Sequence, residues 1–584
     1  MKLLNGYDYL VIVIYMCILV GVGFYFLRFM KGAADYFKAA NKLTWWIGGF
    51  SSFMAAFSVW MFTGGAGIVY REGLTGAIAL GLPGVAIFTG YLLFARLWRR
   101  SRVTTIMGYL EERFNLTTHQ IVSWSYIPVY ILYSGAALFS LGIFISTALK
   151  LDIVLVIWVS GIVILLYTLL GGLWAVTVND TIQFLILLPV CMLLVPLSLI
   201  SIGGFEGLVH KAPAGYFSFP SHGLPWHYLV AYLLLLVHGQ NTNPIAQRYF
   251  SVRNEADAKK VSLLCSSLFL VGIFFWAIPP MAARVIYPDL SGMLDLPNPD
   301  EGSFVVIALH LLPHGLIGLL ISAMFAASMS SLDSVYNLLA GIISKDICQR
   351  MFKQSMSDKA LLRVGQGATL AIGLIVIGLS LLMVKYGAGA FSVMMKISSL
   401  TIAPLATPML LGFLYRKAPS WACLFSFTCS AALAVVFAFY TPLTDYLKSC
   451  GPWMDFSVST ISIVSVAVAA FLISPWLFKS TERARQRIRA FYDKLDTPVD
   501  ESSEIQAAEI DRTSVAKFIG GIALFIGAIV SLFVLIPGTI RERLTSLLIG
   551  LLILGFGAWL YSVGKREKNA QLSVVSKRDE PSPH

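Results

Sequence analysis

The chain has 584 residues, of which 57% are hydrophobic and only 13% are charged. Soluble domains carry about 25% charged residues, so this composition excludes an ordinary soluble enzyme or binding domain. The formal net charge is +12, but the basic residues gather in short segments between apolar runs. That pattern follows the positive-inside rule for membrane proteins, so we expect membrane lipid and no nucleic acid among the partners.

Apolar runs long enough to cross about 30 Å of hydrocarbon recur along almost the whole chain. They predict an all-α, polytopic membrane bundle of about fifteen spans, near residues 7–28, 45–68, 75–97, 121–147, 152–175, 180–202, 227–247, 260–283, 305–343, 361–385, 390–415, 420–440, 456–478, 515–537 and 543–563. The first run lacks a small-residue cleavage site, which favours a retained helix over a signal peptide.

Alternate threading of these spans predicts the orientation. With the N-terminus outside, nearly all connections rich in lysine and arginine fall on the cytoplasmic side, and IRER at 540–543 is an exception. The C-terminus is then cytoplasmic, and the expected location is a plasma (inner) membrane. The seven cysteines show no CxxC spacing and are interpreted as small buried hydrophobic residues.

One sizeable polar segment, residues 479–517, separates two of the predicted spans. Its first half, STERARQRIRAFYDKLD, predicts a charged surface helix, and its second half is acidic and typical of a loop. The segment is too short for a kinase or nucleotide-binding domain, so we interpret it as a cytoplasmic loop that can dock a partner. The tail, 573–584, has a composition typical of disorder.

The stretch FAASMSSLDSVYNLLAG, residues 325–341, places many oxygens inside an apolar run. At helical spacing, Ser330, Ser331, Ser334 and Asn337 share one face, and Asp333 lies at its rim. A carboxylate in mid-membrane costs on the order of 3 kcal/mol and usually marks a pathway or meets a partner. Hydroxyl and carboxylate oxygens are ligands for hard cations, which indicates an ion site. The alternative is a small-residue packing face whose hydroxyls bond back to the helix.

A cation site in a membrane also needs backbone carbonyls that a continuous helix does not offer. The run WWIGGFSSFMAAFSVWMFTGGAG, residues 45–67, has glycines near both ends and small residues around FMAAFS. It predicts a broken helix, and an ordinary kinked span is the alternative.

Several motifs in this order resemble those of the sodium:solute symporter family, which has a leucine-transporter-like inverted-repeat fold. They are VTTIMGYLEERFN, GGLWAVTVNDTIQF near 171–184, AQRYFSVRNEADAKK at 246–260, PPMAARVIYPDL and AASMSSLDSVYNLLAGIISKDI. The resemblance covers about residues 5 to 480 and implies two inverted five-helix repeats plus flanking helices. The implied division is a leading helix and inner loop at 1–44, repeats at 45–202 and 227–415, an outer loop at 203–226, further spans at 416–478 and 518–563, the cytoplasmic loop 479–517, and a cytoplasmic tail at 564–584.

The resemblance also implies ion sites. Matched by position, the main sodium site would use the carbonyls of Met54, Phe57 and Ala327 and the hydroxyls of Ser330 and Ser331. A second sodium site, or an ion pathway, would involve Ser330 again with Asp180, Asp333 and Ser334. Because Asp333 stands where the two-sodium pattern has a serine, the number of ions stays open.

The expected solute contacts lie on the two broken helices: Ser58, Trp60, His238, Gln240 and Asn241. Trp60 and Met61 stand where the sugar-binding members have polar residues, so this is not a copy of their glucose or galactose site. His238 has the alternative of a satisfied packing histidine. The polar run from Gln240 to Asn243 is harder to explain by packing.

The resemblance implies a secondary active transporter: sodium-coupled uptake (symport), by alternating access, of a small polar organic solute such as a sugar, sugar acid, amino acid or carboxylate. Na+ would be the coupling ion. Two alternatives stay open, a proton-coupled symporter with Asp333 as the proton carrier, and a transporter-like sensor without transport. We expect no enzyme activity, because a membrane enzyme needs clustered His, Asp or Glu, and the sequence suggests no such cluster around its histidines.

Overall fold

The computed structural model describes residues 4–27, 43–103, 105–170, 173–242, 245–294, 296, 298–352, 356–386, 390–500 and 512–578. Helices account for most of these residues, and no strand longer than an isolated bridge occurs among them. The predicted inner connection at 28–42, Asn243, and residues 501–511 of the predicted cytoplasmic loop lie outside the described residues.

The helical elements, in chain order, are α1 (Gly6–Leu27), α3 (Trp45–Ala56), η2 (Val59–Phe62), α4 (Gly64–Thr89), η3 (Gly90–Phe94), α5 (Ala95–Arg100), α6 (Ile106–Arg113), α7 (Leu116–Leu149), α8 (Ile153–Leu170), α9 (Leu173–Ile202), α10 (Gly204–Lys211), α11 (Trp226–Gln240), α12 (Ile245–Ser251), α13 (Glu255–Ile286), η4 (Pro299–Gly302), α14 (Ser303–Leu311), α15 (Leu316–Gly341), η5 (Ile342–Phe352), α16 (Asp358–Lys385), α17 (Ala390–Leu414), α18 (Ala422–Phe439), α19 (Thr441–Cys450), α20 (Met454–Leu477), α21 (Glu482–Asp496), α23 (Arg512–Ser531), η6 (Leu532–Leu535) and α24 (Ile540–Arg578).

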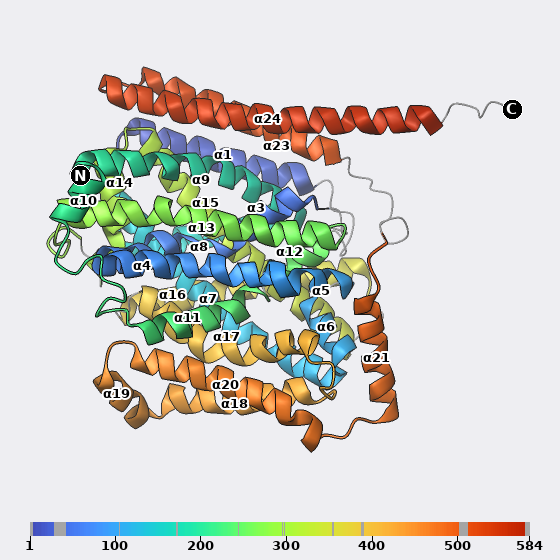
Figure 1. The fold of residues 1–584 in the computed structure, drawn as a ribbon. Coiled ribbons are helices and arrows are strands. Elements are labelled where there is room, and N and C mark those ends of the chain that lie inside the picture. Colours follow the sequence, from blue (N-terminus) through green and yellow to red (C-terminus); the bar gives the residue numbers. More distant parts are fainter. Residues whose placement is uncertain are drawn as a thin grey trace.

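The long helices run side by side in one bundle, with the α23–α24 pair along one edge and the α18–α20 pair along the opposite edge (Figure 1). Among the described residues, eleven helices are long and apolar enough to cross a membrane, and two shorter apolar stretches lie in α1 and α8. The prediction of an all-α polytopic bundle is confirmed. The count of fifteen spans stays a prediction.

Two predicted boundaries are wrong. The single span expected at 305–343 is divided into α14 and α15, because Pro313 lacks a backbone N–H and Gly315 has a left-handed φ of 86°. The tail, expected to be disordered from residue 573, continues as helix α24 to Arg578, and residues 579–584 lie outside the described residues.

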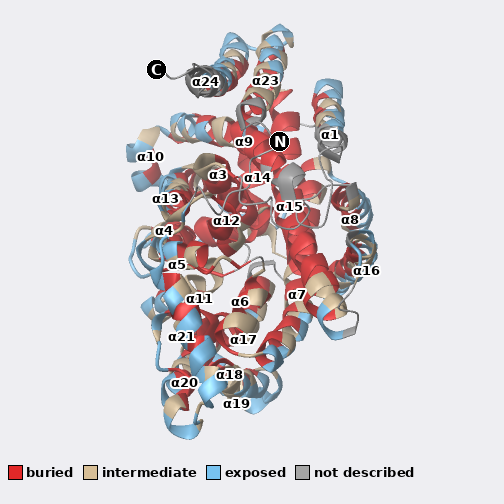
Figure 2. Cartoon of the chain, turned by 90° about the vertical axis from the view of Figure 1, so that its right-hand side faces the viewer, coloured by how far each residue is buried: buried red, intermediate tan, exposed pale blue. Residues whose placement is uncertain are grey.

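The oxygen-rich helix α15 lies at the centre of the bundle. Every one of its residues is buried, and Figure 2 shows it enclosed by other helices. It packs against α1, α3, α7, α8, α9 and α16. A helix buried on all sides has no need of a polar stripe for solubility, so its serines and carboxylate face protein rather than water.

The first core span is broken, as predicted. Helix α3 ends at Ala56, and Phe57 and Ser58 are extended before the chain turns again at η2. Helix α4 then bends at Gly73, whose φ of 55° and ψ of −120° join two helical segments. A second interruption separates α11 from α12. The first break frees backbone groups inside protein, where a membrane protein tolerates them.

Helix α21 lies across one end of the bundle and packs against α5 and α6 (Figure 1). Its buried side chains are Ile488, Phe491, Tyr492 and Leu495. The Tyr492 hydroxyl donates to the Gly412 carbonyl at 2.7 Å, and Lys494 pairs with Glu112 at 2.7 Å. The predicted charged helix is therefore docked on the bundle by one face.

Candidate ion and solute site

Ser331 meets the break of the first core span. Its Oγ lies 3.0 Å from the Phe57 carbonyl, 3.4 Å from the Met54 carbonyl and 3.2 Å from the Ala327 carbonyl. Phe57 is extended, so its carbonyl is outside the hydrogen-bond ladder of α3. Four uncharged oxygens from α3 and α15 therefore converge at one buried point.

A second group of polar side chains centres on Asp180 of α9. Ser330 donates to one carboxylate oxygen, and Ser51 donates to the other at 2.6 Å. Arg248 Nη2 of α12 lies 3.8 Å from the same carboxylate and donates to Ser334 Oγ at 3.0 Å. The side chains of Asp180 and Arg248 are each 1% exposed, so this is a fully buried ion pair.

Asp333 adds a further carboxyl group in this region. It is 1% exposed, and its Oδ1 has no hydrogen-bond partner among the described residues. The bundle centre thus holds two carboxyl groups, Asp180 and Asp333, near the guanidinium of Arg248.

Sequence reasoning missed Ser51 and Arg248. Arg248 lies in the motif AQRYFSVRNEADAKK, five residues beyond the polar run from Gln240 to Asn243. It was assigned to a basic cytoplasmic connection, whereas α12 carries it back into the bundle. An arginine so close to a break inside a span was the signal available.

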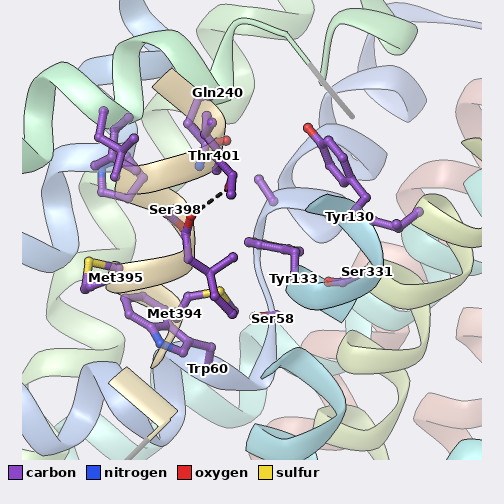
Figure 3. Close-up of a pocket in the computed structure, with 18 of the residues that line it drawn as sticks. Ser58, Trp60, Tyr130, Tyr133, Gln240, Ser331, Met394, Met395, Ser398 and Thr401 are labelled. Atoms are coloured by element: carbon purple, nitrogen blue, oxygen red, sulfur yellow. Dashed lines mark hydrogen bonds between the residues drawn. The ribbon is translucent and has the colours of Figure 1, made fainter. Parts of the chain in front are cut away.

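A cavity adjoins the Ser331 cluster (Figure 3). Its polar lining comes from Ser58, Gln240, Ser331, Ser398 and Thr401. Its aromatic lining comes from Trp60, Tyr130, Tyr133, Tyr232 and Phe269. Gln240, Ser398 and Thr401 line one side, and Tyr130 and Tyr133 face them from α7. No Asp, Glu, Lys or Arg of the described chain lines this cavity.

The structure places three of the five expected solute contacts in this lining: Ser58, Trp60 and Gln240. His238 and Asn241 lie outside it. His238 Nδ1 donates to the Leu234 carbonyl at 2.6 Å, within its own helix. Asn241 Nδ2 donates to Thr89 Oγ1 at 2.9 Å and to the Ala86 carbonyl at 3.1 Å, so it ties α11 to α4. Sequence reasoning missed the tyrosines and the hydroxyls of α17, which no motif in the sequence marks.

A bundle with two broken helices, an oxygen cluster at one break and a cavity beside it is typical of a solute transporter. The sequence model of the sodium:solute symporter family matches residues 36–426, which is more than half of the chain. The chain therefore belongs to the sodium:solute symporter family.

Its relatives are transporters. Sodium/glucose cotransporter 1 of Mus musculus is 26% identical, over 88% of this chain and 87% of its own. The sodium/sialic acid symporter NanT of Aliivibrio fischeri is 24% identical, over 87% of this chain and 98% of its own. Sodium/myo-inositol cotransporter 2 of Oryctolagus cuniculus is 28% identical, over 70% of this chain and 66% of its own.

Among solved structures, a substrate-bound, outward-open, Na+-coupled sialic acid symporter superposes with a TM-score of 0.70, at 21% identity, over 82% of this chain and 99% of its own. This similarity confirms the predicted leucine-transporter-like fold. The chain is a multi-pass membrane protein that couples Na+ to the movement of a small solute.

Proposed function

We propose that the Ser331 cluster is the main sodium site and that the adjoining cavity binds the solute. The ligands would be the carbonyls of Met54, Phe57 and Ala327 and the hydroxyls of Ser331 and, after a change of rotamer, Ser330. The observation that supports this assignment is that Ser331 both meets three carbonyls and lines the cavity. One side chain would thus touch both binding sites.

Sodium at this point would couple to solute through the chain itself. Phe57 would hold the ion by its carbonyl, and Ser58 and Trp60 directly follow it and line the cavity. Ordering the break therefore positions the solute contacts, and linkage requires solute to raise the sodium affinity by the same factor. One charge crossing about 100 mV supplies roughly 2.3 kcal/mol. A tenfold sodium gradient adds about 1.4 kcal/mol. The two contributions together support roughly a few hundred-fold accumulation of the solute inside the cell.

The proposed solute is a small polar organic molecule. Sugars, sugar acids, amino acids and carboxylates were the expected classes, and the relatives named above are transporters of glucose, myo-inositol and sialic acid. A lining of tyrosines, hydroxyls and one glutamine, without charged residues, favours the uncharged members of that set.

We propose further that Asp180, Ser330, Asp333 and Ser334 form a second ion site or the inner ion pathway. Proton coupling is the second candidate, because the unpartnered Oδ1 of buried Asp333 is a place for a proton. A proton-coupled carrier would be driven by a pH gradient without sodium, which uptake by proteoliposomes measures directly.

We also propose that the chain has the two repeats implied by the resemblance, at 45–202 and 227–415. The protein would lie in the plasma membrane, with its N-terminus outside the cell and its C-terminus in the cytoplasm. The exposed face of α21 would be the part of 479–517 that meets a cytoplasmic partner.

The first prediction tests the sodium site. Ser331→Ala removes one ligand hydroxyl, and we expect about tenfold weaker sodium affinity with the protein still folded. Sodium-dependent thermal stabilisation of the purified protein, with choline replacing sodium, measures it. Ser322→Ala is the matched control, because Ser322 lies on the same helix and, within the part of the chain that the structure describes, bonds only to the Gly318 carbonyl at 2.8 Å. An unchanged sodium affinity in Ser331→Ala would contradict the assignment.

A further inference from the structure

A small polar pocket, called the chamber below, lies at the C-terminal end of α15, where α15 continues into η5. Its polar lining comes from Thr105, Gln247, Asn337 and Asp346. Its volume is about 20 Å³, which is enough for one water molecule or one bare monovalent cation. This chamber is separate from the solute cavity and shares no lining residue with it.

Two oxygens of the chamber lack partners. Asp346 is 7% exposed and Asn337 is 4% exposed. Asp346 Oδ2 and Asn337 Oδ1, together with the Asn337 amide nitrogen Nδ2, have no hydrogen-bond partner among the described residues. A buried polar atom without a partner is costly, so a ligand that satisfies either oxygen would be stabilised there. A carboxylate, an amide oxygen and a hydroxyl are the oxygens that a hard cation takes.

The other carboxylate oxygen of Asp346 is fixed in place. Asp346 Oδ1 lies 3.0 Å from His119 Nε2 and accepts from Thr105 Oγ1 at 3.2 Å. Gln120 Nε2 donates to the Asp346 carbonyl at 2.7 Å. These contacts from α7 and the start of α6 orient Asp346 and leave Oδ2 as its free ligand atom.

A polar stripe connects the chamber with the centre of the bundle. Ser330, Ser334, Asn337 and Gly341 follow one another at helical spacing on one face of α15. Arg248 donates to Ser334 on this stripe, and its neighbour Gln247 lines the chamber. The short helix α12 therefore contacts Asp180 through Arg248 and lines the chamber through Gln247.

We propose that the Asn337–Asp346 chamber is a further binding station for a monovalent cation, which holds sodium after it leaves the bundle centre and before it reaches the cytoplasm. The proposal rests on the proposed sodium site only for the source of the ion. The chamber offers two unpartnered oxygens, against the five ligands proposed for the main site, so its affinity for sodium would be lower. Sodium that entered the chamber from the cytoplasm would slow the release of the next sodium ion from the bundle centre.

Equilibrium binding of radioactive sodium to the purified full-length protein tests the station. We expect wild type to bind at least one more ion at high sodium than Asp346→Asn does, with the high-affinity phase unchanged in the variant. Replacing a charged ligand by a neutral one should weaken the low-affinity phase about tenfold. A binding curve of Asp346→Asn that matches wild type would overturn the proposal.

A second variant keeps the test decisive if Asp346→Asn fails to fold. Asn337→Leu removes an unpartnered oxygen and breaks no hydrogen bond of the described chain, and it should also lose the low-affinity phase. Ser344→Ala is the control, because Ser344 lies nearby on η5 and bonds to the Ala340 carbonyl at 2.7 Å. A chamber that holds only water gives wild-type curves for Asn337→Leu and overturns the proposal.

Ser331→Ala, measured in parallel, separates the two assignments. Loss of the high-affinity phase in Ser331→Ala together with a wild-type curve for Asp346→Asn refutes the chamber alone. Loss of the low-affinity phase in Asp346→Asn while Ser331→Ala binds normally refutes the main-site assignment and leaves the chamber supported.

Discussion

Arg248 lies beside two carboxyl groups in a part of the bundle that excludes water. It is 3.8 Å from Asp180 Oδ2, and Asp333 is buried in the same region with Oδ1 unpartnered. Removing one member of a buried ion pair is costly because the other member stays in a low-dielectric interior. Arg248 is therefore needed to balance the charge of the two buried carboxyl groups, independently of any role in transport.

The second prediction follows from this charge balance. Arg248→Met should lower stability by about 3–5 kcal/mol. Adding Asp333→Asn should return part of that loss, since one of the two uncompensated acids is removed. Thermal unfolding of the purified variants measures both effects. Arg253→Met is the control, because Arg253 is a third exposed and pairs with Asp257 at 2.9 Å. Additive losses in the double variant would show that Asp333 and Arg248 are not coupled.

At the scale of elements, the bend in α4 depends on a single glycine. Gly73 has φ 55°, and a Cβ placed there would lie 2.1 Å from the Tyr216 carbonyl oxygen. That carbonyl also accepts from the Leu74 N–H at 3.1 Å. The bend thus connects the first broken span to the loop before α11, and it needs both the backbone freedom and the space of glycine.

The third prediction is that Gly73→Ala destabilises the protein by more than about 2 kcal/mol, from backbone strain and the clash with Tyr216. Yield of folded protein and its melting temperature measure the loss. Gly378→Ala on α16 is the matched control: nothing lies within 4 Å of its added Cβ, so its effect should be neutral or slightly stabilising. Equal behaviour of the two variants would contradict a special role for Gly73.

Helix α21 gives the fourth prediction. Phe491 is 3% exposed, and its ring centroid lies 5.6 Å from that of Tyr109 and 6.3 Å from that of Phe413. Phe491→Ala removes this packing, and truncation of a buried phenylalanine lowers stability by about 3–5 kcal/mol. We therefore expect α21 to detach from the bundle in this variant. Faster proteolysis within residues 479–500 would report release, and the exposed Gln486→Ala should leave the rate unchanged. A wild-type cleavage rate in Phe491→Ala would show that polar contacts alone hold α21.

At the scale of the whole molecule, the charge pattern predicts the orientation in the membrane. Cys450 is exposed at the end of α19, on a connection that the proposed threading places outside. Cys348 on η5 falls on the opposite side. The two native cysteines therefore report on the two faces of the membrane.

The fifth prediction is that a membrane-impermeant maleimide added to intact cells labels Cys450, and that Cys450→Ser abolishes this labelling. Cys348 should react only after the membrane is opened. Labelling of Cys450 that requires permeabilised cells would reverse the proposed orientation, with the N-terminus then inside.

The class of protein, the family and the two segments that meet at the proposed sodium site could all be predicted from the sequence. Hydropathy is a local property, so long apolar runs identify spans without knowledge of their neighbours. The hydroxyl-rich stretch and the glycine-flanked break were visible for the same reason. The structure brings Ser331 to Phe57, although the two are separated by 274 positions in the chain.

Which side chains lie together in the cavity depends on how the helices pack in three dimensions. The facing walls of the cavity come from α7, α11 and α17, and no local pattern marks Tyr130, Ser398 or Thr401 as neighbours. The rotation of α11 about its axis turns Gln240 into the cavity and Asn241 toward α4. Arg248 likewise meets Asp180 because α12 re-enters the bundle. Helix rotation and chain re-entry are set by packing across the whole bundle, so a window of sequence contains no information on them.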